Sequence, residues 1–508
     1  MEQRKTNIAL ATALIGLGAC AAADEPKQPN IIMIFADDLG YGDVECLNPQ
    51  SKIKTPHLNS LAENGVLFTN AHSASSVSTP SRYGLLTGEY AWKSSLKAGV
   101  LYGFSAPLID KDKPTIGNML QKEGYHTACI GKWHLGVRWA TTDGKVADGK
   151  GTNVDYTKPL TETPTSRGFD YFYGIAGSMD MPPYLPIEND KVAVQPSAFH
   201  QRTTFTRKDD EIGENPFLRS GAYIKGETPE VFLPRFTAKV KEKITEYAST
   251  SKPFFIYFPM TAPHAPIAPN KTFQGKSGIG RYGDFVMEVD DVVGQVVSHL
   301  KKEGIADNTI ILFSSDNGPE YFAYSRLLDT EQRSAGEWKG IKRDLWEGGH
   351  RIPFIVSWAK ELPKGKRIGE TVSLCDIYAT LADITKHERT AAEAEDSYSL
   401  LPLITAEGRY ERPYTIHHSA SGRFAIRKGN WVLIENGSGN DNGKNSRADY
   451  YKALGYAEEG AKPTGELFDL SKDPKQQTNV YAQHPQVVQE LTALLDKATA
   501  GHKTKRDK

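Results

Sequence analysis

The chain has 508 residues, with 61 Lys and Arg against 62 Asp and Glu and a formal net charge of −1. This balance provides no basic field of the kind that attracts nucleic acid or an anionic membrane surface, so we expect neither partner. The length predicts about two or three domains, or one large α/β domain with an appendage.

The N-terminus predicts export. A short apolar run over residues 8–18 follows a basic start; it is too short to span a bilayer and is typical of a secretory signal peptide. The sequence Leu-Gly-Ala-Cys, ending at Cys20, resembles a bacterial lipobox. We expect a lipoprotein signal peptide over residues 1–19 and a lipid on Cys20, with a plain signal peptide as the alternative. The protein would then lie in the periplasm or on the outer membrane of a Gram-negative bacterium, contacting the membrane only through its lipid.

Apolar runs alternate with helical patterns along most of the chain. The runs cover residues 30–38, 126–134, 253–264, 309–318 and 350–358. Continuous apolar runs of this length are typical of strands buried on both faces of a parallel sheet. Helical patterns lie over residues 114–126 and 282–305, and the second has apolar residues at three- and four-residue spacing before Gly304. This alternation predicts an α/β fold.

The pattern changes near residue 415. Residues 423–437 and 465–470 resemble short antiparallel strands around Gly- and Asn-rich turns, and residues 484–498 form an amphipathic helical pattern. We therefore expect a large N-terminal domain over residues 27–414 and a smaller C-terminal α+β subdomain over residues 415–500.

Oxygen-bearing side chains follow two of the apolar runs. Asp37 and Asp38 end the first run, and Asp316 and Asn317 end the fourth. In α/β folds ligands gather at the carboxyl ends of strands. Adjacent carboxylates repel each other unless a cation neutralises them, and hard oxygen ligands suit Ca²⁺ or Mg²⁺. A single pair would be read as a helix cap or turn; two pairs favour a metal site.

A Ser-Thr-Pro-Ser-Arg sequence covers residues 78–82. Pro80 suits the first turn of a helix, which places Ser78 at or just before the helix start and Arg82 one turn later on the same face. A helix N-terminus beside a guanidinium group forms an anion site. The alternative is an N-cap serine and a surface arginine.

These motifs together resemble the type I sulfatases of the alkaline phosphatase superfamily. Residues 78–88 are similar to the family signature, in which Cys or Ser is followed by x-Pro-Ser-Arg and then Thr-Gly. The sequences ADDLGYGD, GKWHLG, TAPHAP, SDNG, GIKRDLWEGGHRIP and LFDLSKDPKQQTNV resemble further family motifs in the family's order. The resemblance implies a large mixed, mostly parallel sheet flanked by helices, as in alkaline phosphatase. Serine replaces the cysteine of animal members, which implies a bacterial protein matured by an anaerobic sulfatase-maturating enzyme.

The resemblance also implies the catalytic roles. In the family the first signature residue becomes formylglycine, an aldehyde whose hydrate carries two hydroxyls: one attacks the sulfate ester and the other expels sulfate. An unmodified serine would instead form a stable ester. Carried over to this chain, the resemblance implies that Ser78 is the formylglycine precursor. It implies that one Ca²⁺, which also contacts residue 78, is held by Asp37, Asp38, Asp316 and Asn317. It further implies that sulfate is neutralised by Arg82, Lys132 and Lys342, that His134 assists elimination and that His264 protonates the leaving alcohol.

The predicted function is exo-acting removal of O-sulfate from a sulfated carbohydrate of host or dietary glycans. One alternative is a phosphate or phosphonate monoester hydrolase of the same superfamily, whose two-metal members need extra His and Asp ligands. The other is a non-catalytic lipoprotein that binds sulfated glycan. The long polar segments 138–166 and 186–230 are expected to wall the leaving-group side. Candidate sugar contacts are Tyr184, His200, His417, His418 and Arg423.

Overall fold

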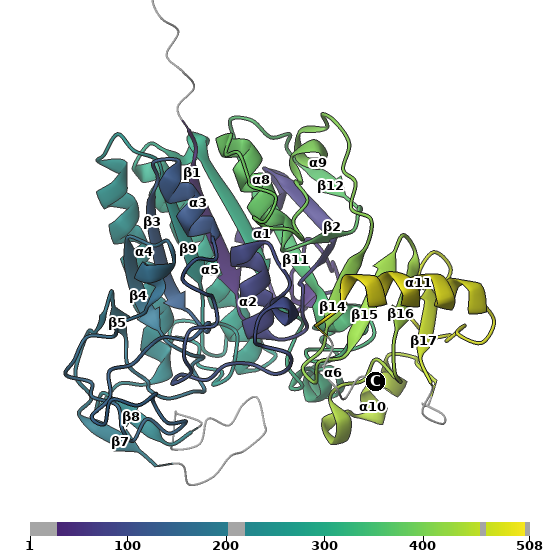
Figure 1. The fold of residues 1–508 in the computed structure, drawn as a ribbon, viewed down its shortest axis with the longest axis horizontal. Coiled ribbons are helices and arrows are strands. Elements are labelled where there is room, and N and C mark those ends of the chain that lie inside the picture. Colours follow the sequence, from purple (N-terminus) through teal and green to yellow (C-terminus); the bar gives the residue numbers. More distant parts are fainter. Residues whose placement is uncertain (1–27, 202–218, 458–463, 503–508) are drawn as a thin grey trace, which may run out of the picture.

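The computed structural model describes residues 28–201, 219–457 and 464–502 (Figure 1). The expected signal peptide and Cys20 lie outside these ranges, so the lipid anchor and the cellular location remain predictions. Within the described ranges, no helix combines the length and apolar character needed to cross a membrane.

An eleven-stranded mixed sheet forms the centre of the molecule, and parallel pairs make up its middle. Its strands, in spatial order, are β12 (Lys366–Ile368), β2 (Val66–His72), β11 (Arg351–Ser357), β10 (Thr309–Ser315), β1 (Asn30–Ala36), β9 (Phe254–Pro259), β3 (His126–Lys132), β4 (Tyr171–Ile175), β5 (Ile187–Glu188) and β6 (Lys191–Val192), with β13 (Val372–Ser373) paired to β2. The expected fold class, a mostly parallel sheet flanked by helices with a smaller C-terminal α+β part, is confirmed.

One strand differs from the expectation of a parallel sheet. The apolar run over residues 350–358 forms β11, which is antiparallel to both β10 and β2. Its beginning, and not its end, therefore lies at the edge where β10 ends. An apolar run indicates burial on both faces of a sheet, but it carries no information on strand direction.

Helices cover both faces of the central sheet (Figure 1). Alternate residues of β1 point to opposite faces: Ile31, Met33 and Phe35 join one apolar core, and Ile32 and Ile34 join the other. The first core is closed by α2 (Ser78–Thr87), α3 (Ile116–Lys122), α8 (Asp376–Thr385) and α9 (Leu401–Thr405); the second is closed by α1 (Pro56–Glu63), α4 (Phe232–Ala248) and α5 (Arg281–Lys302). Burial on both faces explains why the strands lack polar alternation.

A second sheet of four antiparallel strands follows the central sheet in the chain. It consists of β14 (Thr415–His418), β15 (Phe424–Lys428), β16 (Trp431–Ile434) and β17 (Glu466–Asp469). The terminal helix α11 (Pro485–Ala498) packs on this sheet, and α10 (Ala448–Ala453) packs on α6 (Ala323–Thr330) (Figure 1). The predicted terminal amphipathic helix is thus present.

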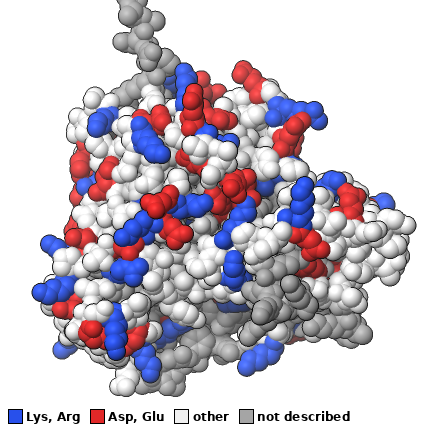
Figure 2. Space-filling model, in the orientation of Figure 1, with Lys and Arg blue, Asp and Glu red and all other residues white. Residues whose placement is uncertain are grey.

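The remaining elements are short. β7 (Ala198–His200) and β8 (Gly221–Tyr223) form a two-stranded ribbon, and α7 (Glu347–His350) immediately precedes β11. Single 3₁₀ turns occur at Tyr41–Asp43, Ala91–Lys93, Pro164–Arg167, Pro229–Val231, Ala306–Asn308 and Gly443–Asn445. Figure 2 shows Lys and Arg interspersed with Asp and Glu over the viewed face, in keeping with the balanced composition.

The longest helix holds a buried acid. Glu288 of α5 is 3 % exposed and accepts a hydrogen bond of 2.7 Å from the backbone N–H of Asn270. Burial raises the pKa of Glu288 to about 7. The folded protein thus binds a proton on the Glu288 carboxyl group more tightly than the unfolded chain does.

We expect the stabilisation from protonated Glu288 to be complete below about pH 4.5 and to be lost as the pH rises through about 7, a total of about 3 kcal/mol. Glu288→Gln keeps an acceptor for Asn270 and does not titrate. The free energy of unfolding of the variant, relative to the wild type, should therefore increase between pH 5 and 8 in urea titrations. A constant difference across that range would contradict the raised pKa.

Candidate functional site

Two pairs of oxygen-bearing side chains meet at one edge of the central sheet. Asp37 and Asp38 follow β1, and Asp316 and Asn317 follow β10. Because β1 and β10 pair in parallel with Ala36 opposite Ser315, the pairs are adjacent in space. The backbone N–H of Asp38 donates to Asp316 Oδ1 at 3.1 Å. Asp38 has a φ of 65°, a left-handed conformation that is strained for a side-chain-bearing residue and recurs at functional sites.

Ser78 lies at the first turn of α2, as the position of Pro80 predicts. Its Oγ is 3.3 Å from Asp37 Oδ1, 3.5 Å from Asn317 Oδ1 and 3.4 Å from Lys132 Nζ. The helix N-terminus therefore brings this hydroxyl to the carboxylate edge, where it faces both acceptors and a cation.

The cation Arg82 lies one helical turn beyond Ser78. Its guanidinium group donates to Asp316 Oδ2 at 2.8 and 3.1 Å and to Asp37 Oδ1 at 3.2 Å. Arg82 and both carboxylates have no exposed side-chain area. Such buried charges persist only when they are paired, so Arg82 and these acids depend on each other.

Two lysines complete the charge compensation. Lys132, the last residue of β3, donates to both oxygens of Asp37 at 2.7 and 2.8 Å, and Lys342 donates to Asp38 Oδ2 at 2.7 Å. Burial alone would raise the pKa of Asp37, but Lys132 and the other nearby cations hold it well below its usual range. Burial also lowers the pKa of Lys132, against the opposing effect of Asp37.

Two histidines lie beside this cluster in fixed tautomers. His134 Nε2 is 2.8 Å from the carbonyl oxygen of Leu101, which can only accept, so Nε2 carries the proton. His134 Nδ1 is then an acceptor, and it has no hydrogen-bond partner among the described residues. Burial and the neighbouring cations hold the pKa of His134 well below its usual range, which keeps the ring neutral. His264 Nδ1 is 2.6 Å from the carbonyl oxygen of Ala265, and its Nε2 is 3.5 Å from Asp38 Oδ2.

The cluster opens into a cavity of about 460 Å³. Ser78, His134, His264 and Lys342 are among the residues that line it. Two ion pairs form further parts of its wall: Arg219 with Asp180 at 3.0 Å and Arg343 with Glu320 at 2.8 Å. The cavity therefore combines a floor of paired acids and cations with hydrogen-bonding walls, an arrangement suited to a polar ligand.

The donor set at the floor fits a hard cation. Asn317 Nδ2 donates to Asp38 Oδ1 at 2.7 Å and to the carbonyl of Gly318 at 2.9 Å, which leaves its amide oxygen facing Ser78. Asp37 and Asp38 each offer an oxygen within 4.8 Å of the other and of His264. Carboxylate and amide oxygens suit Ca²⁺ better than they suit a transition metal, so we favour the oxygen atoms over His264 as ligands.

The five predicted sugar contacts do not line this cavity. His417 and His418 are buried in β14, His200 is buried in β7, and Arg423 donates to the carbonyls of Ser438 and Asn440. The hydroxyl of Tyr184 bonds to the backbone N–H and C=O of Arg219 at 3.1 and 2.9 Å, so Tyr184 supports a wall residue from behind. Position in or beside a long polar segment gives no information on which way these side chains point.

Several wall residues are absent from the sequence prediction. Glu320 lies four residues after Asp316, and Arg343 directly follows Lys342, so their closeness to motif residues is a usable signal. Arg219 lies in the segment 186–230, which the sequence predicts as a wall, but no sequence pattern marks this residue or Asp180 individually. These four side chains form two separate ion pairs in the cavity wall, and only the fold shows that pairing.

Comparison with known proteins gives consistent results. A model of the sulfatase family matches residues 29–387. The chain is 34% identical to an N-acetylgalactosamine-6-O-sulfatase of Bacteroides thetaiotaomicron, covering 92% of this chain and 93% of that protein, and 29% identical to human arylsulfatase A, covering 95% and 89%. A solved B. thetaiotaomicron protein from work on glycosaminoglycan metabolism superposes with a TM-score of 0.78 at 32% identity, covering 93% of this chain and 99% of that one.

Replacement of Arg82 tests the buried charge network. Arg82→Met leaves Asp316 without its guanidinium partner, and breaking a buried ion pair in this way costs about 3–5 kcal/mol. We expect that loss in the free energy of unfolding, measured in urea with a chelator present so that no metal replaces the cation. The control is Arg409→Ala, an exposed pair with Glu411, which should change the value by less than about 1 kcal/mol. Equal stability of both variants would contradict the interdependence.

Proposed function

Because the chain belongs to the sulfatase family and is a sulfuric ester hydrolase, we propose that it removes O-sulfate from a sulfated carbohydrate by exo action. In this proposal Ser78 is converted to formylglycine. One Ca²⁺ is held by Asp37, Asp38, Asp316 and Asn317. The N-acetylgalactosamine-6-O-sulfatase relative supports a sulfated glycan as the substrate class.

The position of Ser78 is the observation that carries this proposal. Its side chain lies on the cavity floor at the N-terminus of α2, within 3.5 Å of Asp37, Asn317 and Lys132. A nucleophile placed there faces whatever enters the cavity and lies within reach of a metal on the oxygen cluster. An aldehyde hydrate at this position would supply one hydroxyl to attack sulfur and a second to expel sulfate. Ca²⁺ would neutralise the carboxylates and polarise a sulfate oxygen.

The buried cations stabilise negative charge that develops during sulfate transfer. Lys342 lines the cavity, while Arg82 and Lys132 lie beneath Ser78 with no exposed side-chain area. Burial alone would lower the pKa of Lys342, but the carboxylate of Asp38 raises it, so this lysine remains a cation. Fixed cations in a site of low dielectric act strongly and do not reorganise during the reaction.

The two histidines have separate roles. Neutral His134 presents an unprotonated Nδ1, which can accept a proton from a hydroxyl on residue 78 during elimination. His264 lines the cavity and holds a proton on Nδ1 against the carbonyl of Ala265, with Nε2 directed toward Asp38. We assign to His264 the protonation of the departing alcohol: the imidazolium form, with its second proton on Nε2 beside the Asp38 carboxylate, gives that proton to the alkoxide and returns to the neutral ring.

The cavity wall indicates how a sugar would be held. Asp180 with Arg219 and Glu320 with Arg343 offer acceptors and donors side by side, which suits a ligand with several hydroxyl groups. A cavity of about 460 Å³ holds one or two sugar rings, which supports action at the end of a glycan. The proposal further includes a transient encounter with an anaerobic maturating enzyme and a lipid on Cys20.

Maturation at Ser78 is the first test. Co-expression with an anaerobic sulfatase-maturating enzyme should convert Ser78 to formylglycine, and activity should rise in proportion to conversion, because unmodified serine has no route to release sulfate. Mass spectrometry of the peptide that contains residue 78 measures the conversion. Ser78→Ala is the control and should be inactive under both conditions. Full activity in a preparation that contains only unmodified serine would overturn the proposal.

Substrates with different leaving groups separate the role of His264 from that of Arg82. We expect His264→Ala to lower kcat/KM by about 10²–10⁴-fold on a sulfated sugar, whose alkoxide is a poor leaving group, and far less on an activated aryl sulfate. Arg82→Ala should lower kcat/KM on both substrates by a similar factor, because Arg82 acts on the sulfate that they share. Equal losses for His264→Ala on both substrates would move the proton donor to another residue, such as Lys342.

A further inference from the structure

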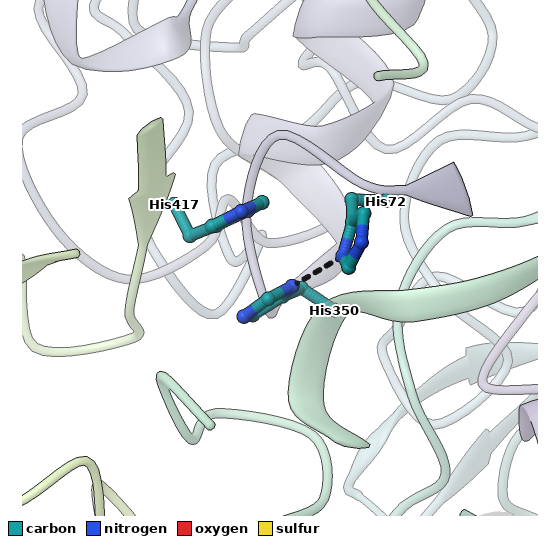
Figure 3. Close-up of side chains that lie close together, drawn as sticks. All are labelled: His72, His350 and His417. Atoms are coloured by element: carbon teal, nitrogen blue, oxygen red, sulfur yellow. Dashed lines mark hydrogen bonds between the residues drawn. The ribbon is translucent and has the colours of Figure 1, made fainter. Parts of the chain in front are cut away.

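Three buried imidazoles from separate parts of the chain meet behind the segment that leads to Ser78. His72 ends β2, His350 ends α7, and His417 lies in β14 of the second sheet (Figure 3). Each is at most 2 % exposed, and one ring nitrogen from each lies within 4.8 Å of the other two. Figure 3 shows the rings of His417 and His350 lying nearly parallel and the hydrogen bond that joins His350 to His72.

The hydrogen bonds of His72 and His350 leave the Nδ1 atoms of the two rings facing each other. His72 Nε2 is 2.9 Å from Asn70 Oδ1, and His350 Nε2 is 3.1 Å from the carbonyl oxygen of Leu345. Both partners are acceptors, since the Asn70 amide nitrogen donates to the carbonyl of Gly369. If both Nε2 atoms carry protons, two neutral rings direct Nδ1 lone pairs at each other across 2.9 Å. A cation between them would remove this repulsion.

The third ring has the same kind of support. His417 Nδ1 is 3.3 Å from the carbonyl oxygen of Ser73, and its Nε2 is 3.3 Å from Thr415 Oγ1, whose hydroxyl can donate to it. Each ring thus has one nitrogen against a carbonyl or amide oxygen and one that can accept; the accepting nitrogen of His417 meets the Thr415 hydroxyl and must turn inward to reach an ion. Metal-ligating histidines show this arrangement, in which the outer N–H donates to a carbonyl and fixes the ring. Burial also lowers the pKa of all three rings, to about 4 for His350, so they are neutral ligands near pH 7.

We propose that His72, His350 and His417 bind one divalent transition metal ion of the imidazole-preferring class, with Zn²⁺ as the probe. Neutral imidazole suits Zn²⁺, Cu²⁺ and Ni²⁺, whereas Ca²⁺ requires oxygen ligands. The carboxylate of Glu347 is 3.8 Å from the outer nitrogen of His72 and is paired with Arg351 at 2.8 Å, so it lies behind the ligands.

Metal binding requires a small movement of His72 and His350 and a rotation of His417 away from Thr415. Zn–N bonds of about 2.1 Å place ligand nitrogens about 3.4 Å apart in a tetrahedron, so the 2.9 Å contact between His72 and His350 opens by about half an ångström. His417 stacks on His350, with ring centroids 3.7 Å apart and planes 8° apart, and must rotate to direct its Nε2 at the ion. The ring centroids of His72 and His417, 5.2 Å apart, already suit a shared ion.

A bound ion would connect the two sheets. His72 belongs to the central sheet and His417 to the second, and the backbone carbonyl of His418 accepts from Ser75 Oγ at 2.7 Å and from Ser76 N at 3.0 Å. The ion would therefore stabilise the packing that holds residues 73–77 in front of Ser78. It would act on folding and not on the sulfate ester itself.

The competing occupant is a proton. Arg427 Nη1 lies 3.3 Å from His72 Nε2, so Arg427 could donate there while a proton on His72 Nδ1 bridges to His350. In that arrangement the three rings need no metal.

Zinc titration separates these two occupants. We expect chelator-treated protein, with Ca²⁺ restored in excess, to bind one Zn²⁺ per chain by calorimetry and to unfold at a higher temperature once Zn²⁺ is added. His350→Gln and His417→Gln should each weaken Zn²⁺ binding by at least about 100-fold. Two controls should keep the wild-type affinity: His126→Gln, which removes a histidine stacked on Tyr247 elsewhere, and Asp37→Asn, which weakens the other potential metal cluster.

Three results would overturn the proposal. No binding of Zn²⁺ would mean that a proton occupies the cluster. Binding that survives both glutamine variants, or that is lost in Asp37→Asn, would place the ion elsewhere. If the glutamine variants fail to fold, Co²⁺ added to the Ca²⁺-loaded wild type gives the answer: visible bands typical of nitrogen ligation support the site, and a spectrum of oxygen-only octahedral Co²⁺ rejects it.

Discussion

The arrangement of the site depends on one constraint, the compensation of buried charge at the ends of β1 and β10. The parallel register of these strands brings three carboxylates together without exposed area. Carboxylates so close would drive one another to protonate unless cations intervened. Arg82, Lys132 and Lys342 are supplied by α2, by β3 and by the segment before α7, so three elements are fixed in place by one electrostatic requirement.

This charge compensation also sets the conditions under which the proposed metal would bind. Each carboxylate already has a cationic partner, so the charges of the cluster balance without an ion, and a divalent cation would have to share these acids with the protein's own cations. In the proposed function, the same cations lie beside the sulfate at the floor. Folding and anion recognition would then use the same residues, so no single one of these charges can be assigned to stability alone.

The sequence predicts the floor of the site well and its walls poorly. Asp37, Asp316 and Ser78 follow from apolar runs and a short motif, because residues at strand ends and helix starts have positions fixed by local structure. The wall depends on which side chains converge from distant segments, as Asp180 and Arg219 do. Strand direction is likewise set by tertiary pairing, so the apolar run of β11 predicts burial but not its antiparallel course.

The second sheet shows why a change of pattern along the chain does not mark a change of function. β14 begins at Thr415, where the sequence pattern changes, and its histidines resemble candidates for a substrate surface. In the fold they face inward: His417 packs against His72 and His350, and the backbone of His418 forms a bridge to Ser75. Three residues after Ser75 the chain reaches Ser78. The second sheet therefore supports the segment that leads to Ser78, the proposed nucleophile position, and a disturbance in β14 reaches it through backbone hydrogen bonds rather than through contact with substrate.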